Sequence, residues 1–198
     1  MRIPWRWLFI GLILFGAWRY WHERPVIQPA EIVAADSPVQ TSKGQGKTYA
    51  HGDYQLEVLA SFDIEARVLS KEIYHVGRES DLSPVDLALG WGPMSDSSVL
   101  DSLTISQGGR FYYYHWDNEP PIPPSEIARH SANMHLIPTD AALDKRMREA
   151  RVGQVVHITG QLVEARAPDG WHWRSSLTRD DTGNGACELI RVESIEFR

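Results

Sequence analysis

The sequence predicts an α+β protein, in which an N-terminal transmembrane helix and a flexible tether precede a mainly antiparallel β domain with a few short helices. Three observations predict this class: an apolar N-terminal segment, a Pro- and Gly-rich stretch after it, and alternating apolar residues in much of the remainder. Hydrophobic residues make up 42% of the chain and charged residues 23%, values typical of folded proteins. We expect an anchor over residues 1–24, a linker over 25–52 and one globular domain over 53–198.

The first segment has the composition of a membrane helix. Residues 8–18 carry no charged side chain, and Trp and Tyr residues flank them on both sides. A helix from Ile3 to Trp21 would rise about 28 Å, close to the thickness of a hydrocarbon core. We expect residues 3–21 to contact the lipid bilayer as an uncleaved single span. A cleaved signal peptide and a buried core helix are the alternatives.

The charges indicate where the body lies and what it does not bind. Arg2 and Arg6 precede the apolar run and favour an N-terminus inside the cytoplasm. The protein would then sit in the inner (cytoplasmic) membrane, with its body in the periplasm or otherwise outside the cytoplasm. Beyond residue 24 the chain has 16 basic and 25 acidic residues, so nucleic acid is not an expected partner.

Periodicity and capping signals predict the elements of the body. Apolar residues alternate from Tyr54 to Val76, which indicates strands with one wet face. Thr139 is the expected cap of the clearest helix, Asp140 to Ala150, and Pro168 to Gly170 forms a turn. The other expected helices cover residues 83–89, 95–103 and 125–129, and the other expected strands cover 110–116, 155–165, 171–177 and 188–197.

Three blocks of the sequence carry resemblances. Gly153 to Val163 resembles the opening strand of an OB-type barrel, in which a glycine lets a long strand bend, so an OB-like barrel is expected at the C-terminal end. The blocks SPVDLALGWGPMSD, from Ser83, and SSLTRDDTGNGACE, from Ser175, resemble a group of single-span membrane-anchored bacterial proteins. No activity is associated with that group, so the second resemblance implies location and architecture alone.

One loop has half of a calcium-binding pattern. Oxygen-bearing side chains alternate and a glycine follows, as in the first half of a calcium loop: Asp180, Thr182, Asn184 and Gly185. The twelfth position is Arg191 instead of Glu, and Glu188 replaces a ligand only in part. A polar hairpin without metal is the interpretation that we prefer, and a metal near Asp180 and Asp181 is the alternative. No cofactor is expected.

Cys187, His135 and Asn133 are the candidate catalytic residues. A thiol nucleophile needs a base within hydrogen-bond reach and a group that orients the base, which His135 and Asn133 could supply. The alternative is that Cys187 is a small buried hydrophobic residue.

Aromatic residues are the candidate binding residues: Trp91, Trp171, Trp173 and Tyr113. Such side chains form stacking surfaces for ligands, but in an alternating strand half of them point into the core instead.

The function that we expect is noncatalytic. The anchor, the tether and the absence of a recognisable catalytic motif indicate a membrane-anchored envelope protein, whose body binds an envelope protein or another envelope ligand. The rival hypothesis is an anchored hydrolase or transferase that uses Cys187 and His135, or a metal near Asp180 and Asp181.

Overall fold

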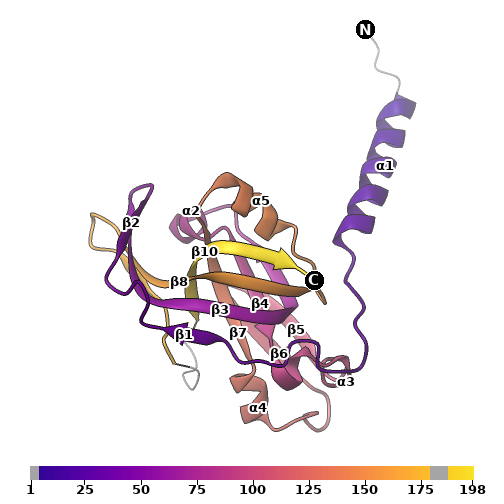
Figure 1. The fold of residues 1–198 in the computed structure, drawn as a ribbon. Helices are drawn as coiled ribbons and strands as arrows, with labels where there is room; N and C mark the ends of the chain where they lie inside the picture. Colours follow the sequence, from indigo (N-terminus) through magenta and orange to yellow (C-terminus); the bar gives the residue numbers. More distant parts are fainter. Residues whose placement is uncertain (1–4, 179–186) are drawn as a thin grey trace.

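The computed structural model describes residues 5–178 and 187–198 (Figure 1). In this part of the chain the protein has a mixed α+β fold that is mostly sheet, with five helices, a mixed sheet of eight strands and a separate two-stranded hairpin. The candidate metal ligands Asp180, Asp181, Thr182 and Asn184 lie outside the described residues.

Five strands form a closed ring. In ring order they are β3 (Tyr54–Ile73), β4 (Val85–Gly90), β7 (Ser131–Pro138), β10 (Glu188–Phe197) and β8 (Val155–Arg166), and β8 pairs again with β3. Neighbours in the ring are antiparallel except for β7 and β10, which are parallel because the chain crosses back through β8 before it reaches β10. The sequence predicted a mainly antiparallel domain with an OB-like barrel at its C-terminal end. The structure corrects this: the sheet is mixed, because β7 and β10 are parallel, and the ring begins at Tyr54.

The bends that close the ring have local causes. Strand β3 shifts register between Val58 and Ala60 and again between Val68 and Ser70, which lets one long strand pair with β8 along one part and with β4 along another. A Cβ atom at Gly160 would lie 2.3 Å from the carbonyl oxygen of Arg191. Only glycine therefore lets β8 and β10 approach this closely.

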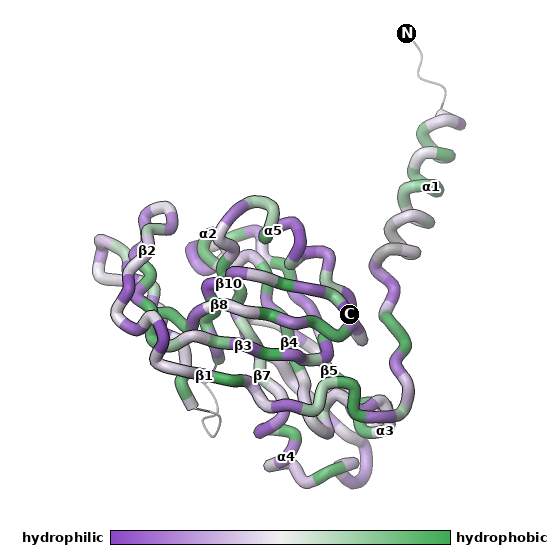
Figure 2. The backbone as a smooth tube through the Cα atoms, viewed as in Figure 1, coloured by the Kyte–Doolittle hydropathy of each residue, from purple (hydrophilic) through white to green (hydrophobic). Residues whose placement is uncertain are grey.

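The inside of the ring is the main core. Apolar residues at alternate positions of all five strands fill it, including Phe62, Leu87, Leu136, Ile158 and Ile190. Hydropathy alternates along the strands accordingly (Figure 2). Helix α5 (Ala141–Arg148) adds Met147 to this core, and the N–H of Leu143 donates to the Asp140 side chain at 2.8 Å. Asp140 is the cap of this helix, one residue after the Thr139 that the sequence indicated.

Other elements surround the ring. The hairpin of β5 (Thr104–Gly108) and β6 (Phe111–His115) lies between β4 and β7 in the sequence. In space it packs on the outer faces of these two paired strands. The short strand β9 (His172–Arg174) extends the sheet beyond β8. The remaining short elements are α2 (Arg78–Leu82), η1 (Gly92–Ser95), α3 (Ser97–Leu100) and α4 (Pro124–Arg129). Residues 85–90 form a strand instead of the expected helix, because Val85, Leu87 and Leu89 alternate into the core.

The predicted transmembrane helix is not supported. Helix α1 (Trp5–Glu23) forms, but no helix in the described part of the chain is long and apolar enough to cross a membrane. The physical reason is the length of its apolar centre. Residues 8–18 rise only about 16 Å, roughly half of a hydrocarbon core about 30 Å thick, and Trp, Tyr and Arg residues make up much of the rest.

The segment expected to be a flexible tether makes ordered contacts with the body. Strands β1 (Val39–Thr41) and β2 (Thr48–His51) both pair with β3. Upstream of them Ala34 is buried, and its carbonyl accepts the N–H of Gly92 at 2.7 Å. The segment therefore adds strands to the sheet, because its backbone groups satisfy the free edge of β3.

Candidate functional site

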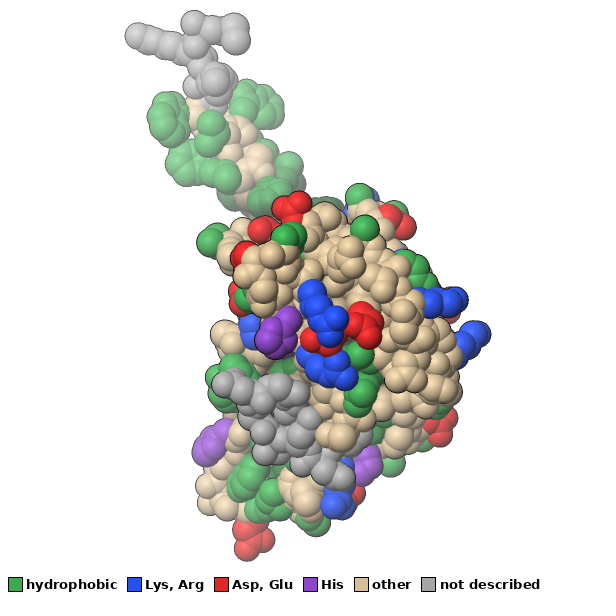
Figure 3. Space-filling view, turned by 90° about the vertical axis from the view of Figure 1, so that its left-hand side faces the viewer, with side chains coloured by type: hydrophobic (Ala, Val, Ile, Leu, Met, Phe, Trp, Pro, Cys, Tyr) green, Lys and Arg blue, Asp and Glu red, His purple; other side chains and the backbone are tan. Residues whose placement is uncertain are grey.

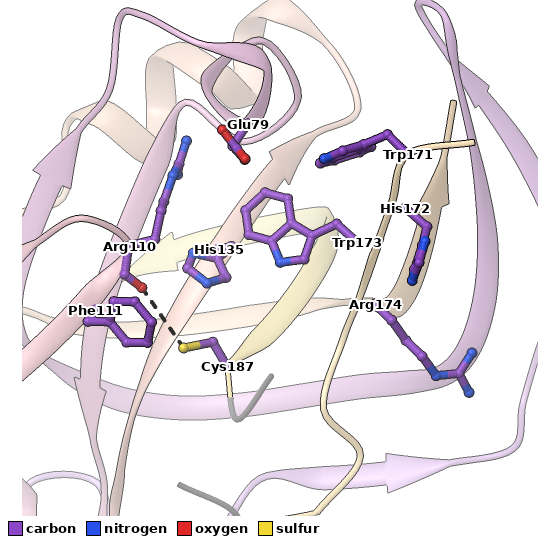
Figure 4. Close-up of a pocket in the computed structure, with 9 residues that line it drawn as sticks. All are labelled: Glu79, Arg110, Phe111, His135, Trp171, His172, Trp173, Arg174 and Cys187. Carbon is purple, nitrogen blue, oxygen red and sulfur yellow. Dashed lines mark hydrogen bonds between the residues drawn. The ribbon is translucent and has the colours of Figure 1, made fainter. Parts of the chain in front are cut away.

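A pocket of about 230 Å³ lies where the loops after β3 and β8 meet the outer face of β4 and β7 (Figure 4). The residues that line it come from α2, the β5–β6 turn, β7, the β8–β9 region and the start of β10: Glu79, Arg110, Phe111, His135, Trp171, His172, Trp173, Arg174 and Cys187. Larger hollows lie beside β2 and between α1 and α5. This smaller pocket is distinguished by the buried polar groups in its floor.

The floor is a buried polar network centred on Asp86. Its side chain is completely buried, with Oδ1 2.7 Å from Nη1 of Arg110 and Oδ2 2.9 Å from Nδ1 of His135. The histidine contact has an ion-pair distance without the alignment of a good hydrogen bond. Asn133 completes the network by donating to Oδ2 of Asp86 at 3.4 Å and to the Arg110 carbonyl at 2.8 Å.

The register of the sheet places these groups together. Asp86 on β4 is directly opposite His135 on β7, and both side chains point away from the core of the ring. A buried carboxylate is tolerated only when it is paired and hydrogen-bonded, and this one has contacts with three side chains. The network therefore satisfies a charge that the fold has enclosed.

Arg110 is held in an unusual conformation at the tip of the β5–β6 hairpin. It is the one non-glycine residue with a positive φ, 72°, in the described part of the chain. Its guanidinium also donates to the Ser83 carbonyl at 2.9 Å and lies 3.8 Å from the centre of the Tyr74 ring. A residue other than glycine in this region is strained, so its contacts in the network offset a conformational cost.

Two tryptophans form an aromatic wall. The ring of Trp173 lies 4.7 Å from that of His135 and 6.3 Å from that of Trp171, which it meets edge to face. Figure 4 shows Trp173 between the other two rings. The guanidinium of Arg78 lies over the Trp171 side chain, 5.3 Å from the centre of its aromatic ring. The wall presents apolar faces beside the polar floor, the usual composition of a ligand-binding site.

Ionisable groups around the pocket have shifted pKa values. Burial raises the pKa of the Tyr74 phenol, and a hydrogen bond from the Arg110 N–H offsets this in part. Glu164, beside β9, loses solvation, which by itself raises its pKa. Hydrogen bonds from Arg174 and Arg166 outweigh that loss, so the pKa of Glu164 is lowered.

The structure brings together some of the residues singled out in the sequence and separates others. Cys187 and His135 line one pocket with Trp171 and Trp173, and Asn133 lies in its floor. The other candidates do not line the pocket: Trp91 is buried in the core, and Tyr113 is 56% exposed on β6. Glu188 is a buried residue at the start of β10.

Sequence reasoning missed Asp86 and Arg110. A carboxylate in the apolar run Val85 to Leu89 was a usable signal, because an unpaired acid is rarely buried in a strand. Ser83 and Pro84, a capping residue followed by proline, instead predict a helix over residues 83–89 with Asp86 in its first turn. Arg110 follows two glycines, and nothing local indicated that the hairpin folds back over β7.

The fold and the site define a small β-barrel protein with a pocket of aromatic and charged residues on one outer face. Comparison with known proteins finds no matching family model, no matching curated protein and no matching solved structure for this chain.

Proposed function

We propose that the body is a ligand-binding module and that its ligand enters the pocket between Trp173 and Arg110. The observation that carries the proposal is where the pocket lies in the ring. In OB-type barrels the loops after the first and fourth strands and the face of the second and third strands bind oligonucleotides or oligosaccharides. Here those places correspond to the loops after β3 and β8 and to the face of β4 and β7, where the pocket lies.

The ligand that we propose is a saccharide of the cell envelope, and the charge of the body and the size of the pocket support this choice. Beyond residue 24 the chain has 16 basic and 25 acidic residues, which opposes nucleic acid. The pocket, about 230 Å³, is smaller than the roughly 300–1,000 Å³ typical of sites for drug-sized ligands. One sugar ring of a longer chain would therefore enter, packed on Trp171 and Trp173, with its hydroxyl groups facing the polar residues.

The test uses tryptophan fluorescence and calorimetry with an N-acetylglucosamine oligomer as the probe. We expect saturable binding, weakened roughly fivefold in Trp173→Ala, since a stacking contact contributes about 1 kcal/mol and each tenfold change in affinity is about 1.4 kcal/mol. Tyr113→Ala is the matched control, because Tyr113 is an exposed aromatic residue outside the pocket. Binding that Trp173→Ala leaves unchanged, or preferential binding of single-stranded DNA, would contradict the proposal.

A lipid surface is the partner that we propose for α1. Apolar side chains surround this helix, which projects from the body (Figure 3). Trp5, Trp7, Tyr20 and Trp21 are each more than 60% exposed near its two ends, and aromatic residues of this kind favour the interface between membrane and water. Lipid contact would cover this surface. The placement of the body in the envelope, outside the cytoplasm, stays a prediction.

A further inference from the structure

The proposed function requires binding alone, yet the same pocket contains the parts of a nucleophilic site. We infer that Cys187 is a nucleophile, activated by His135, which Asp86 orients, and that it accepts the acyl group of a small ester or thioester. The inference goes beyond the binding function and rests on separate observations. It concerns Asp86 on β4, His135 on β7 and Cys187, the residue directly before β10.

The first observation is the orientation of His135. Only 3% of its side chain is exposed. His135 is directly opposite Asp86 on the neighbouring strand, and this pairing places its Nδ1 2.9 Å from Oδ2 of Asp86. Trp173 packs on the ring at 4.7 Å between centres. Nδ1 is therefore the ring nitrogen on the side of Asp86, at an ion-pair distance without an aligned hydrogen bond, and Nε2 lies on the other side of the ring. His135 lines the pocket, so Nε2 is the nitrogen available to it.

The second observation is the position of the thiol. The parallel pairing of β7 and β10 places Glu188 opposite Met134, so Cys187, one residue earlier, lies alongside the Asn133–His135 stretch. Its Sγ is 4.0 Å from the Arg110 carbonyl and lines the pocket together with His135 (Figure 4). A nucleophile, a base and a group that orients the base are the three parts that thiol catalysis needs.

The reaction is an acyl transfer in two balanced steps. Sγ of Cys187 attacks the carbonyl carbon of the ester while Nε2 of His135 takes the thiol proton. The bond from that carbon to the leaving oxygen or sulfur then breaks, and the leaving group takes the proton from His135. Water, with His135 again as base, attacks the thioester on Cys187, releases the carboxylic acid and restores the thiol. Asp86 is a positioning residue, because it holds His135 and touches no reacting atom.

Several charged groups surround the thiol and the imidazole, and they enter any pH dependence. They come from each element packed against the pair: Asp86 on β4, Arg110 in the hairpin turn, Glu79 on α2, and His172 and Arg174 on β9. A reactive thiol beside a base stays nucleophilic well below pH 8.5, near which an ordinary cysteine ionises. The pH profile therefore distinguishes an activated thiol from an ordinary one.

The test incubates the full chain with p-nitrophenyl acetate and measures p-nitrophenolate release and the intact mass. Cys187 is the one cysteine in the sequence, so an added acetyl group that is absent in Cys187→Ala is assigned without ambiguity. We expect a burst of one p-nitrophenolate per chain. His135→Gln should slow it by about 100-fold, the usual contribution of a general base. Asp86→Asn should shift the pH profile toward that of an ordinary thiol.

The chain offers a matched control. His157 and Asp63 form another His–Asp pair, also 2.9 Å apart, on strands β8 and β3 outside the pocket. His157→Gln should leave the burst unchanged. If the pocket variants unfold, the pH dependence of the acetylation rate of the wild-type protein still tests the inference. An acetylation rate that falls tenfold for each pH unit below 8.5 is that of an ordinary thiol and overturns the inference. Saccharide binding by Cys187→Ala is measured separately, so the binding function and the thiol chemistry can fail independently.

Discussion

Asp86 has no exposed surface, and its two oxygens face Arg110, His135 and Asn133. Burying a carboxylate costs free energy unless partners replace the water that it loses. The partners, in turn, are oriented by it: Arg110 at the hairpin tip and His135 on the adjacent strand. One residue therefore connects the stability of the pocket floor with the geometry of the groups that line it.

We expect Asp86→Ala to lower the free energy of unfolding by about 3 kcal/mol or more, because it leaves the guanidinium of Arg110 enclosed without its acidic partner. Denaturant titration at pH 7 measures this. The exposed pair of Asp63 and His157 is the comparison, since Asp63→Ala should cost at most about 1 kcal/mol. Equal decreases in the free energy of unfolding in the two variants would show that the buried Asp86 network stabilises the fold no more than an exposed ion pair does.

At the scale of elements, β9 connects the barrel with the aromatic wall. Register places Arg174 opposite Glu164 on β8, and Arg166 also donates to Glu164, at 3.0 Å. Trp173, the neighbour of Arg174, packs against the ring of His135. The ion pairs that hold β9 to β8 therefore also hold the wall of the pocket in place.

The lowered pKa of Glu164 predicts an acid dependence of stability. Because the folded-state pKa lies below the unfolded value of about 4.3, the contribution is fully present above that value and is lost as the pH falls through the folded pKa. We expect Glu164→Gln to remove about 1 kcal/mol at pH 7 and to flatten the acid limb of the stability curve. Thermal unfolding between pH 3 and pH 7 measures both. An acid limb equal to that of the wild type would contradict this role of Glu164.

At the scale of the whole molecule, the N-terminal region divides into a projecting part and a part that belongs to the barrel. Helix α1 extends away from the body in Figure 1, whereas residues 25–52 add β1 and β2 to the sheet and bury Ala34. A Cβ atom on Gly153 would lie 1.9 Å from the Val26 carbonyl oxygen, so the chain between α1 and β1 also packs closely on the body.

Two truncations test this division. Removal of residues 1–24 should change the free energy of unfolding by less than about 1 kcal/mol, because few body contacts are lost. Removal of residues 1–52 should cost several times more, since each lost backbone hydrogen bond contributes about 1 kcal/mol. Denaturant titration compares the two forms.

The shorter truncation also tests the partner of α1. The full chain should co-sediment with phosphatidylglycerol-containing vesicles, and residues 25–198 should not. Equal sedimentation of both forms would contradict a lipid contact through α1, and equal stability of the two truncations would contradict the packing of residues 25–52.

The sequence by itself determined the elements whose signals are local. The alternation after Tyr54 predicted strands where β3 lies, the extended run over residues 155–165 predicted β8, and the final strand was placed at its observed bounds, Glu188–Phe197. Each depends on side chains that face alternately into the core and toward solvent along one segment. The aromatic and nucleophilic candidates Trp171, Trp173, His135 and Cys187 were named from residue type alone.

Which of these residues lie together depends on long-range contacts. Residues 85–90 have a helix-start signal, but they form a strand because the interior of the ring buries Val85, Leu87 and Leu89. The pairing of Asp86 with His135 depends on strand register, and its pairing with Arg110 depends on a hairpin that folds over the sheet. Neither feature can be predicted from the residues adjacent to Asp86 in the sequence. The site is therefore a product of long-range pairing, which residue spacing along the chain does not encode.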